Sequence, residues 1–242
     1  MKKNSLILNI LLSLCIPYMQ AKCICINKYL TLFTGKDPQA YQNKYPSWKI
    51  VKCPTHQKFV NKIEETPAKL AYLCAGIGNV ADLLDHHPDL TISPSSITIE
   101  VYTHSQNGIT TKDISFIKNV EKRISLLKTA NTIIQEKIDT KNESLDKTID
   151  YLEKSGWTLN NNGTELILNI KSPEFTRISK ALSKCILLPD FASECNKIEL
   201  SYGSLSISLR NKLTKKVVVS TALYAKMCHT MLMANVPSLV IK

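Results

Sequence analysis

The sequence predicts a fold of mixed helices and strands, and three observations support this prediction. Short segments in which apolar and polar side chains alternate predict half-buried strands. Longer segments with an apolar side chain every three or four residues predict amphipathic helices. The same order of patterns occurs in both halves of the 242-residue chain, which predicts two related halves in tandem.

The first half opens with two short predicted strands, residues 47–53 and 57–63. A third strand is predicted over residues 96–104, where apolar and polar positions alternate. Its apolar positions are Ile97, Ile99 and Val101. Each pattern is typical of a strand with one buried face.

A helix is predicted between the second and third strands. Thr66 is a favourable N-cap, and Pro67 suits the first helical position. Pro88 is expected to stop the helix, because a proline ring pushes the preceding residue out of helical geometry. The apolar stripe consists of Leu70, Leu73, Ile77, Val80 and Leu84.

A second helix is predicted after the third strand. Thr110 and Asp113 form a T-x-x-D capping box at its start. The polar segment 139–144 beyond it is the expected boundary between a domain of residues 45–139 and a domain of residues 140–242. The apolar stripe consists of Ile117, Val120, Ile124, Leu127, Ile134 and Ile138.

The second half carries weak echoes of the first. The segment around Trp157 echoes that around Trp48, and Ser172 with Pro173 restates the helix start. The sequence "LLPD" at 187–190 falls where "HHPD" stands in the first half. We therefore predict a degenerate repeat that has lost the histidine pair.

Residues 1–21 have the composition of an export signal, with Lys2 and Lys3 before an apolar run and Ala21 at the cleavage position. Residues 22–44 form a lead before the first strand. Entry into a secretory or export pathway is expected, with an organelle as one destination and no membrane attachment after cleavage. An uncleaved buried helix is the alternative, and a cytoplasmic protein is expected if the N-terminus is misinterpreted.

Charge and cysteine content exclude some classes of function. The 31 Lys and Arg residues outnumber the 20 Asp and Glu residues, but they are scattered, so nucleic-acid binding is not expected. The eight cysteines include no C-x-x-C pair, which gives a structural zinc site little support. Cys74 and Cys185 fall in apolar helical patterns and are expected to be buried packing residues.

Two of the five histidines, His86 and His87, are adjacent at the end of the first helix. The partial negative charge of the helix C-terminus favours a protonated imidazole, so the pair is expected to supply a proton donor. Asp82, one turn earlier, is placed to orient the ring of His86. The alternative is an exposed helix end that carries histidines without a function.

His104, at the end of the third strand, is expected to approach this pair. Three imidazoles around one pocket can act as proton donor, proton acceptor and substrate anchor. A three-histidine zinc site is a competing use of the same side chains, but it requires a preformed tetrahedral arrangement.

The segments "ADLLDHHPD" (81–89), "ITIEVYTH" (97–104) and "NGITTKD" (107–113) resemble the signature of the pterin-4a-carbinolamine dehydratase family. The resemblance extends from Trp48 to Ile124. It implies an α+β fold in which a four-stranded antiparallel sheet carries helices on one face, here present twice in tandem. It also implies dehydration of a 4a-hydroxytetrahydropterin to the quinonoid dihydropterin, in tetrahydrobiopterin recycling.

The resemblance implies that His86, His87 and His104 are the catalytic residues. Expelling water from C4a needs one proton donated and one removed, so two imidazoles in opposite protonation states suffice without a metal or cofactor. We expect His86 and His87 to divide these transfers, in an undetermined order, and His104 to hold the pterin.

Asp82, Asp89 and Asp113 are the expected supporting acids of this site. Asp82 stands where the family commonly has glutamate, and Asp113 has a purely structural alternative as the capping acid of its helix. The family usually shows aromatic residues after the histidine pair. This chain has Leu90, Thr91 and Pro94 there.

The second half is expected to be inactive and to serve as a built-in partner subunit, which makes the chain an intramolecular pseudo-dimer and leaves homo-oligomers open. The small-molecule pterin is the expected ligand. The alternative function is a non-catalytic pterin-binding protein or dimerisation cofactor of the same fold, although an export signal argues against a nuclear role.

Overall fold

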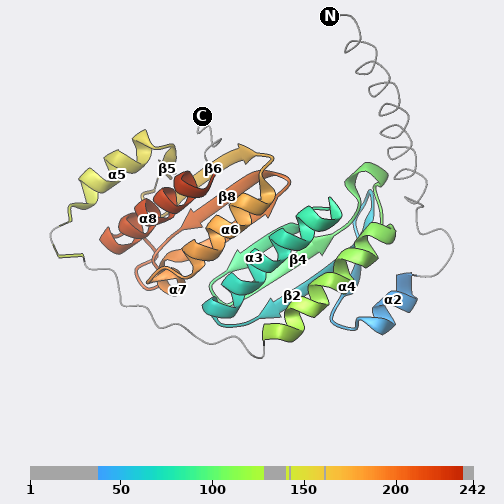
Figure 1. Ribbon diagram of the computed structural model, residues 1–242. Coiled ribbons are helices and arrows are strands. Elements are labelled where there is room, and N and C mark those ends of the chain that lie inside the picture. The colour runs from blue at the N-terminus through green and yellow to red at the C-terminus, as the bar shows by residue number, and fades with distance from the viewer. Residues whose placement is uncertain (1–37, 128–139, 142, 161, 237–242) are drawn as a thin grey trace, which may run out of the picture.

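The computed structural model describes residues 38–127, 140–141, 143–160 and 162–236 (Figure 1). The predicted export signal, most of the predicted lead, and Ile134 and Ile138 of the second helix lie outside these ranges. The helices are α2 (Pro38–Lys44), α3 (Pro67–Leu84), the 3-10 turn η1 (His104–Gln106), α4 (Thr111–Leu126), α5 (Leu145–Lys154), α6 (Phe175–Ile186), α7 (Phe191–Glu194) and α8 (Val219–Asn235). The strands are β1 (Lys49–Lys52), β2 (Gln57–Glu64), β3 (Asp89–Ser93), β4 (Ser96–Val101), β5 (Trp157–Leu159), β6 (Leu166–Ser172), β7 (Cys195–Ser201) and β8 (Gly203–Leu209).

Helix α3 begins where the sequence predicts and ends earlier. Thr66 is its extended N-cap, with Pro67 at the first turn, and the helix ends at Leu84. Asp85 takes the left-handed conformation (φ 45°), and the backbone N–H groups of Asp85 and His86 donate to the carbonyls of Asp82 and Ala81. This arrangement caps the last turn. The histidine pair therefore lies just beyond the helix, and the prediction that it occupies the last turn is wrong.

Strand β3 was not predicted. Its five residues follow the histidine pair and Pro88, and Leu90 and Ile92 are buried on one face. The strand forms an antiparallel hairpin with β4, in which Asp89 pairs with Glu100 and Ser93 with Ser96. Because β4 ends at Val101, His104 lies in η1 and not in the strand.

Helix α4 begins with the predicted capping box. The Thr110 hydroxyl accepts the backbone N–H of Lys112, and the Asp113 carboxylate accepts the backbone N–H of Thr110. The buried face of the helix includes Phe116, Ile117 and Val120.

The strands form one eight-stranded antiparallel sheet in the order β1-β2-β4-β3-β7-β8-β6-β5. The α+β class is confirmed, but the prediction of a separate four-stranded sheet in each half is wrong. Strand β3 pairs with β7, with Leu90 opposite Leu200 and Ile92 opposite Ile198. This pairing satisfies the backbone groups of two strands that would otherwise be exposed edges.

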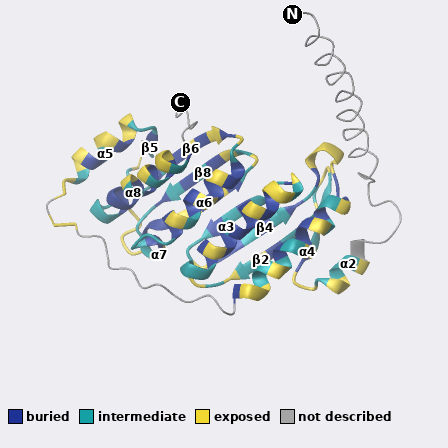
Figure 2. Cartoon of the chain, in the orientation of Figure 1, coloured by how far each residue is buried: buried dark blue, intermediate teal, exposed yellow. Residues whose placement is uncertain are grey.

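Helices α3, α4, α6 and α8 cover one face of this sheet (Figure 1). Figure 2 shows exposed residues on their outer sides and buried residues toward the strands. Helices α3 and α6 pack together across the joint between the halves, where the Thr176 hydroxyl donates to the Gly78 carbonyl at 2.8 Å. The joint is therefore held by both layers, through β3 with β7 and α3 with α6.

The order of elements in the first half, helix-strand-strand-helix-strand-strand-helix, recurs in the second half with the short helix α7 added. The "LLPD" segment follows α6 as the histidine pair follows α3. Helix α6 begins two residues after Pro173, later than predicted. Descent of the second half from a copy of the first stays a prediction, as do the domain boundaries.

The buried cysteines are packing residues, as predicted for Cys74 and Cys185. Burial raises the pKa of the Cys74 thiol to about 12 and holds the thiol in its protonated form. Among the described residues, no helix is both long and apolar enough to cross a membrane.

Candidate functional site

The three histidines predicted to form the site line one pocket of about 450 Å³. Four segments form its wall: the α3–β3 connection, the η1 turn, the start of α4 and the β7–β8 turn. The lining residues are Asp85, His86, His87, Asp89, Thr103, His104, Ser105, Lys112, Ser201 and Tyr202. The pocket thus brings together all three predicted imidazoles and the predicted supporting acid Asp89.

His86 is buried and paired with the Asp113 carboxylate. Its Nε2 lies 2.8 Å from Asp113 Oδ1, and the Asp113 side chain has no exposed surface. An ionised carboxylate only accepts hydrogen bonds, and an imidazole Nε2–H can donate to it at this distance. Nδ1 is then the ring atom that remains for proton exchange with a ligand.

The other oxygen of Asp113 holds the start of α4 together. Oδ2 accepts the backbone N–H of Thr110 at 2.6 Å and the Thr103 hydroxyl at 2.9 Å. The two roles considered for Asp113, capping a helix and supporting the histidine site, therefore do not exclude each other. Asp113 caps α4 and it orients His86, so the position of the ring depends on the capping box.

His87 lies between two aromatic rings of the second half. Its ring meets Phe175 edge-on, with 5.3 Å between centroids, and lies 4.8 Å from the Tyr202 ring at a tilt of 39°. Burial lowers the pKa of His87, and the nearby carboxylates of Asp85 and Asp82 oppose this shift. We expected the helix end to favour a protonated ring, but desolvation has the larger effect here.

His104 is the exposed member of the set, with half of its side chain in solvent. Its Nε2 lies 3.7 Å from Asp89 Oδ2, close enough for charge attraction. Burial raises the pKa of Asp89, and the neighbouring His104 acts against that shift. The ring of His104 also packs on Tyr102, which in turn stacks on His56, with 4.1 Å between centroids in each pair.

Asp82 does not meet His86. Its Oδ1 accepts the hydroxyl of Thr176 at 2.5 Å, so this carboxylate serves the contact between α3 and α6. The sequence places Asp82 one turn before the histidine, but the chain leaves the helix at Asp85 and turns the His86 ring toward α4. The contact predicted between the two side chains is replaced by the His86–Asp113 pair.

Several residues of the pocket were missed by sequence reasoning. Lys112 donates through Nζ to the Asp85 carbonyl at 3.2 Å and lines the pocket, and Ser201 and Tyr202 come from the second half. Its position as a basic residue within the capping box is only a weak sequence signal that Lys112 lines the pocket. Nothing in the local sequence places the β7–β8 turn beside the first half.

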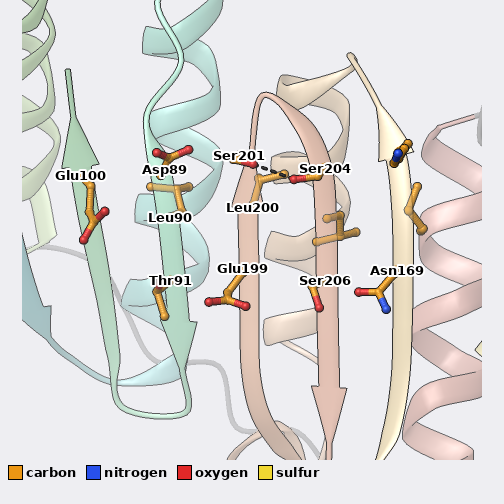
Figure 3. Close-up of a pocket in the computed structure, with 13 residues that line it drawn as sticks. Asp89, Leu90, Thr91, Glu100, Asn169, Glu199, Leu200, Ser201, Ser204 and Ser206 are labelled. Carbon is orange, nitrogen blue, oxygen red and sulfur yellow. Dashed lines mark hydrogen bonds between the residues drawn. The ribbon is translucent and has the colours of Figure 1, made fainter. Parts of the chain in front are cut away.

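A second hollow, of about 770 Å³, lies on the open face of the sheet across the joint (Figure 3). Its floor carries polar side chains from five strands, among them Thr91, Glu100, Asn169, Glu199 and Ser206. It shares Asp89 and Ser201 with the histidine pocket.

The arrangement in the histidine pocket suits proton transfer to and from a small polar ligand. It combines a half-buried imidazole with a lowered pKa, a carboxylate-held imidazole and an exposed one. Within the described ranges, no group of three or more His, Cys, Asp or Glu side chains is placed to hold a metal ion.

Comparison with known proteins matches residues 32–123 to the family model described as pterin 4 alpha carbinolamine dehydratase. Two relatives bear the name "Putative pterin-4-alpha-carbinolamine dehydratase". The one from Picosynechococcus is 33% identical over 85 residues, which is 34% of this chain and 87% of the relative. The one from Sulfolobus acidocaldarius is 42% identical over 43 residues, which is 18% of this chain and 47%, or about half, of the relative.

Among solved structures, a protein titled transcriptional coactivator/pterin dehydratase from Brucella melitensis matches 37% of this chain and 98% of its own length. The identity is 19% and the TM-score is 0.32.

Proposed function

The chain belongs to the pterin-4a-carbinolamine dehydratase family, and from this premise we propose that it removes water from a 4a-hydroxytetrahydropterin. The product is the quinonoid dihydropterin, which places the reaction in tetrahydrobiopterin recycling. The observation that carries the proposal is the convergence of His86, His87 and His104 on one pocket within the matched residues.

The reaction needs two proton transfers. The bond between C4a and its hydroxyl oxygen breaks, and the departing oxygen takes a proton and leaves as water. A ring nitrogen next to C4a loses its proton, and the electron pair of that N–H bond forms the new carbon–nitrogen double bond. One general acid and one general base balance the step.

We assign the proton acceptor to His87. Its pKa is lowered by burial, so the ring is neutral at neutral pH and can take the proton from the ring nitrogen. His86 is the donor, because the Asp113 carboxylate at 2.8 Å balances the positive charge that a donating ring carries. His104, exposed at the rim beside Asp89, holds the polar edge of the pterin.

The proposal is tested by giving the purified full chain freshly generated 4a-hydroxytetrahydropterin and following product formation by absorbance. Wild type should accelerate dehydration over buffer. The double variant His86→Ala/His87→Ala should lose about 10²- to 10⁴-fold in rate, which is the usual contribution of general acid and base groups.

The matched control is His229→Ala, which changes a histidine on α8 that lies outside the pocket. It should retain the wild-type rate. Wild type without acceleration, or a double variant with full activity, would remove the catalytic proposal. Pterin binding without turnover would favour the non-catalytic alternative.

A further inference from the structure

The second half, which lies outside the matched residues 32–123, forms one wall of the histidine pocket. The contributing residues are Ser201 and Tyr202, at the turn that joins β7 to β8. The pairing of β3 with β7 brings this turn to the pocket, because β3 starts at Asp89, immediately after the histidine pair and Pro88.

The β7–β8 turn is closed tightly. Ser201 pairs with Ser204 in the ladder, and their hydroxyls are 2.7 Å apart. Between them Gly203 takes a φ of +90°, a backbone conformation that residues other than glycine rarely adopt. The turn therefore presents Tyr202 from a defined backbone position.

Tyr202 is a large aromatic residue left exposed beside reactive groups. It is 59% exposed although its ring contacts His87, which also contacts the buried Phe175. Both rings against His87 thus come from the second half. An exposed aromatic ring at the rim of a pocket offers a flat apolar surface that a ligand can cover.

We propose that Tyr202 is a substrate-positioning residue, whose ring stacks on the planar bicyclic ring of the pterin beside His87. This inference rests on the proposed function, because it takes a pterin as the ligand. It gives the second half a role in the site: this half carries none of the three site histidines, and it supplies the aromatic wall. A ligand stacked on Tyr202 also lies within reach of the imidazole that accepts the proton.

The test uses Tyr202→Ala and Tyr202→Phe in the full chain. The Kd of biopterin, a stable oxidised pterin, is measured by fluorescence titration, and kcat and KM are measured with the 4a-hydroxytetrahydropterin. Loss of a stacking ring should raise Kd and KM by about 10-fold for Tyr202→Ala, since aromatic stacking of this kind supports differences of that order. The value of kcat should change by less than about 3-fold, because the stacking contact stabilises the bound substrate and the transition state equally.

Tyr202→Phe keeps the ring and should stay within about 2-fold of wild type in Kd. Tyr72→Ala is the matched control, because Tyr72 is an exposed tyrosine on α3 outside the pocket, and it should leave Kd and KM unchanged. Far-UV circular dichroism checks that each variant is folded.

A wild-type Kd for Tyr202→Ala would overturn the inference, and so would a fall in kcat with Kd and KM unchanged. The two proposals fail in different ways. If wild type binds biopterin but does not catalyse, the proposed function falls and the Kd comparison still decides the role of Tyr202. If the catalytic proposal holds and Tyr202→Ala binds normally, only the inference falls. If wild type binds no pterin, both fall.

Discussion

His86 and His87 are neighbours in the chain with opposite surroundings. His86 is held by a buried carboxylate of α4, whereas His87 lies between Phe175 and Tyr202 of the second half. Different environments are what allow two identical side chains to serve as donor and acceptor in one reaction. The proposed division of roles depends on Asp113 and on the aromatic pair, and not on the histidines alone.

The lowered pKa of His87 gives a pH dependence with a definite sign. Burial lowers the pKa of His87, the Asp85 and Asp82 carboxylates oppose this shift, and the neighbouring His86 and Lys112 reinforce it. A proton acceptor must be neutral, so kcat/KM should begin to fall only as the pH drops below the ordinary histidine value of about 6.5. Nuclear magnetic resonance titration of the His87 ring should give a midpoint below that value.

The same shift affects stability. The unfolded chain binds the His87 proton more readily than the folded chain. The contribution of His87 to the free energy of unfolding is therefore fully present above the ordinary histidine pKa. It is lost as the pH falls through the lowered pKa of the folded chain. In Tyr202→Ala the His87 ring becomes more exposed, and the titration midpoint of His87 should move upward. A midpoint at or above the ordinary value in wild type would contradict the assignment of His87 as acceptor.

At the scale of elements, the packing of α3 against α6 depends on a glycine. A Cβ placed on Gly78 would come within 1.9 Å of Ser179 Oγ and 3.1 Å of Ser179 Cβ, whereas one on Gly76 would meet the Arg123 side chain at an ordinary 3.5 Å. Close helix packing therefore requires glycine at position 78 but not at position 76.

Gly78→Ala should lower the free energy of unfolding by about 1–3 kcal/mol, because the added methyl group overpacks the joint between the halves. Urea denaturation followed by circular dichroism measures this change. Gly76→Ala is the matched control and should be neutral or stabilising by up to about 1 kcal/mol, the usual helical advantage of alanine.

Adding Ser179→Ala to Gly78→Ala should recover part of the loss, because it removes the nearest atom. A Gly78→Ala variant as stable as Gly76→Ala would show that α3 and α6 do not approach as closely as the structure has them.

At the scale of the whole molecule, the two halves share one sheet and one helical layer. Leu90, Ile92, Ile198 and Leu200 face each other across β3 and β7 and are all buried. Separating the halves would expose this core and two strand edges together. The predicted pseudo-dimer is therefore expected to unfold as a unit.

The two tryptophans allow a direct test, since Trp48 lies in the first half, Trp157 in the second, and both are buried. In Trp48→Phe the remaining fluorescence reports on the second half, and in Trp157→Phe on the first. In each variant the fluorescence and circular dichroism transitions in urea should coincide.

Trp48→Phe should have the lower midpoint of the two, because it removes the 2.7 Å hydrogen bond from Trp48 Nε1 to Glu121. The buried Nε1 of Trp157 has no hydrogen-bond partner among the residues that the structure describes. Fluorescence of one tryptophan changing while circular dichroism keeps most of its signal would mean that the halves unfold separately.

The sequence by itself determined the local structure of the first half and the identity of its candidate site residues. Alternating and helical patterns located β2, α3, β4 and α4, and the capping box of Thr110 and Asp113 formed as predicted. The resemblance to the dehydratase family named the three histidines. These features were predictable because they depend on side chains a few residues apart, or on a signature within one short stretch of chain.

Tertiary structure alone decided the partners of those residues. In the structure His86 pairs with Asp113, and Asp82 accepts a hydrogen bond from Thr176. Strand β3 pairs with β7, and Tyr202 lines the pocket. The family usually shows aromatic residues just after the histidine pair, whereas the aromatic residue that lines the pocket here, Tyr202, comes from a distant turn. Such contacts depend on which strand edge meets which, and on the residue where a helix ends, and local periodicity encodes neither.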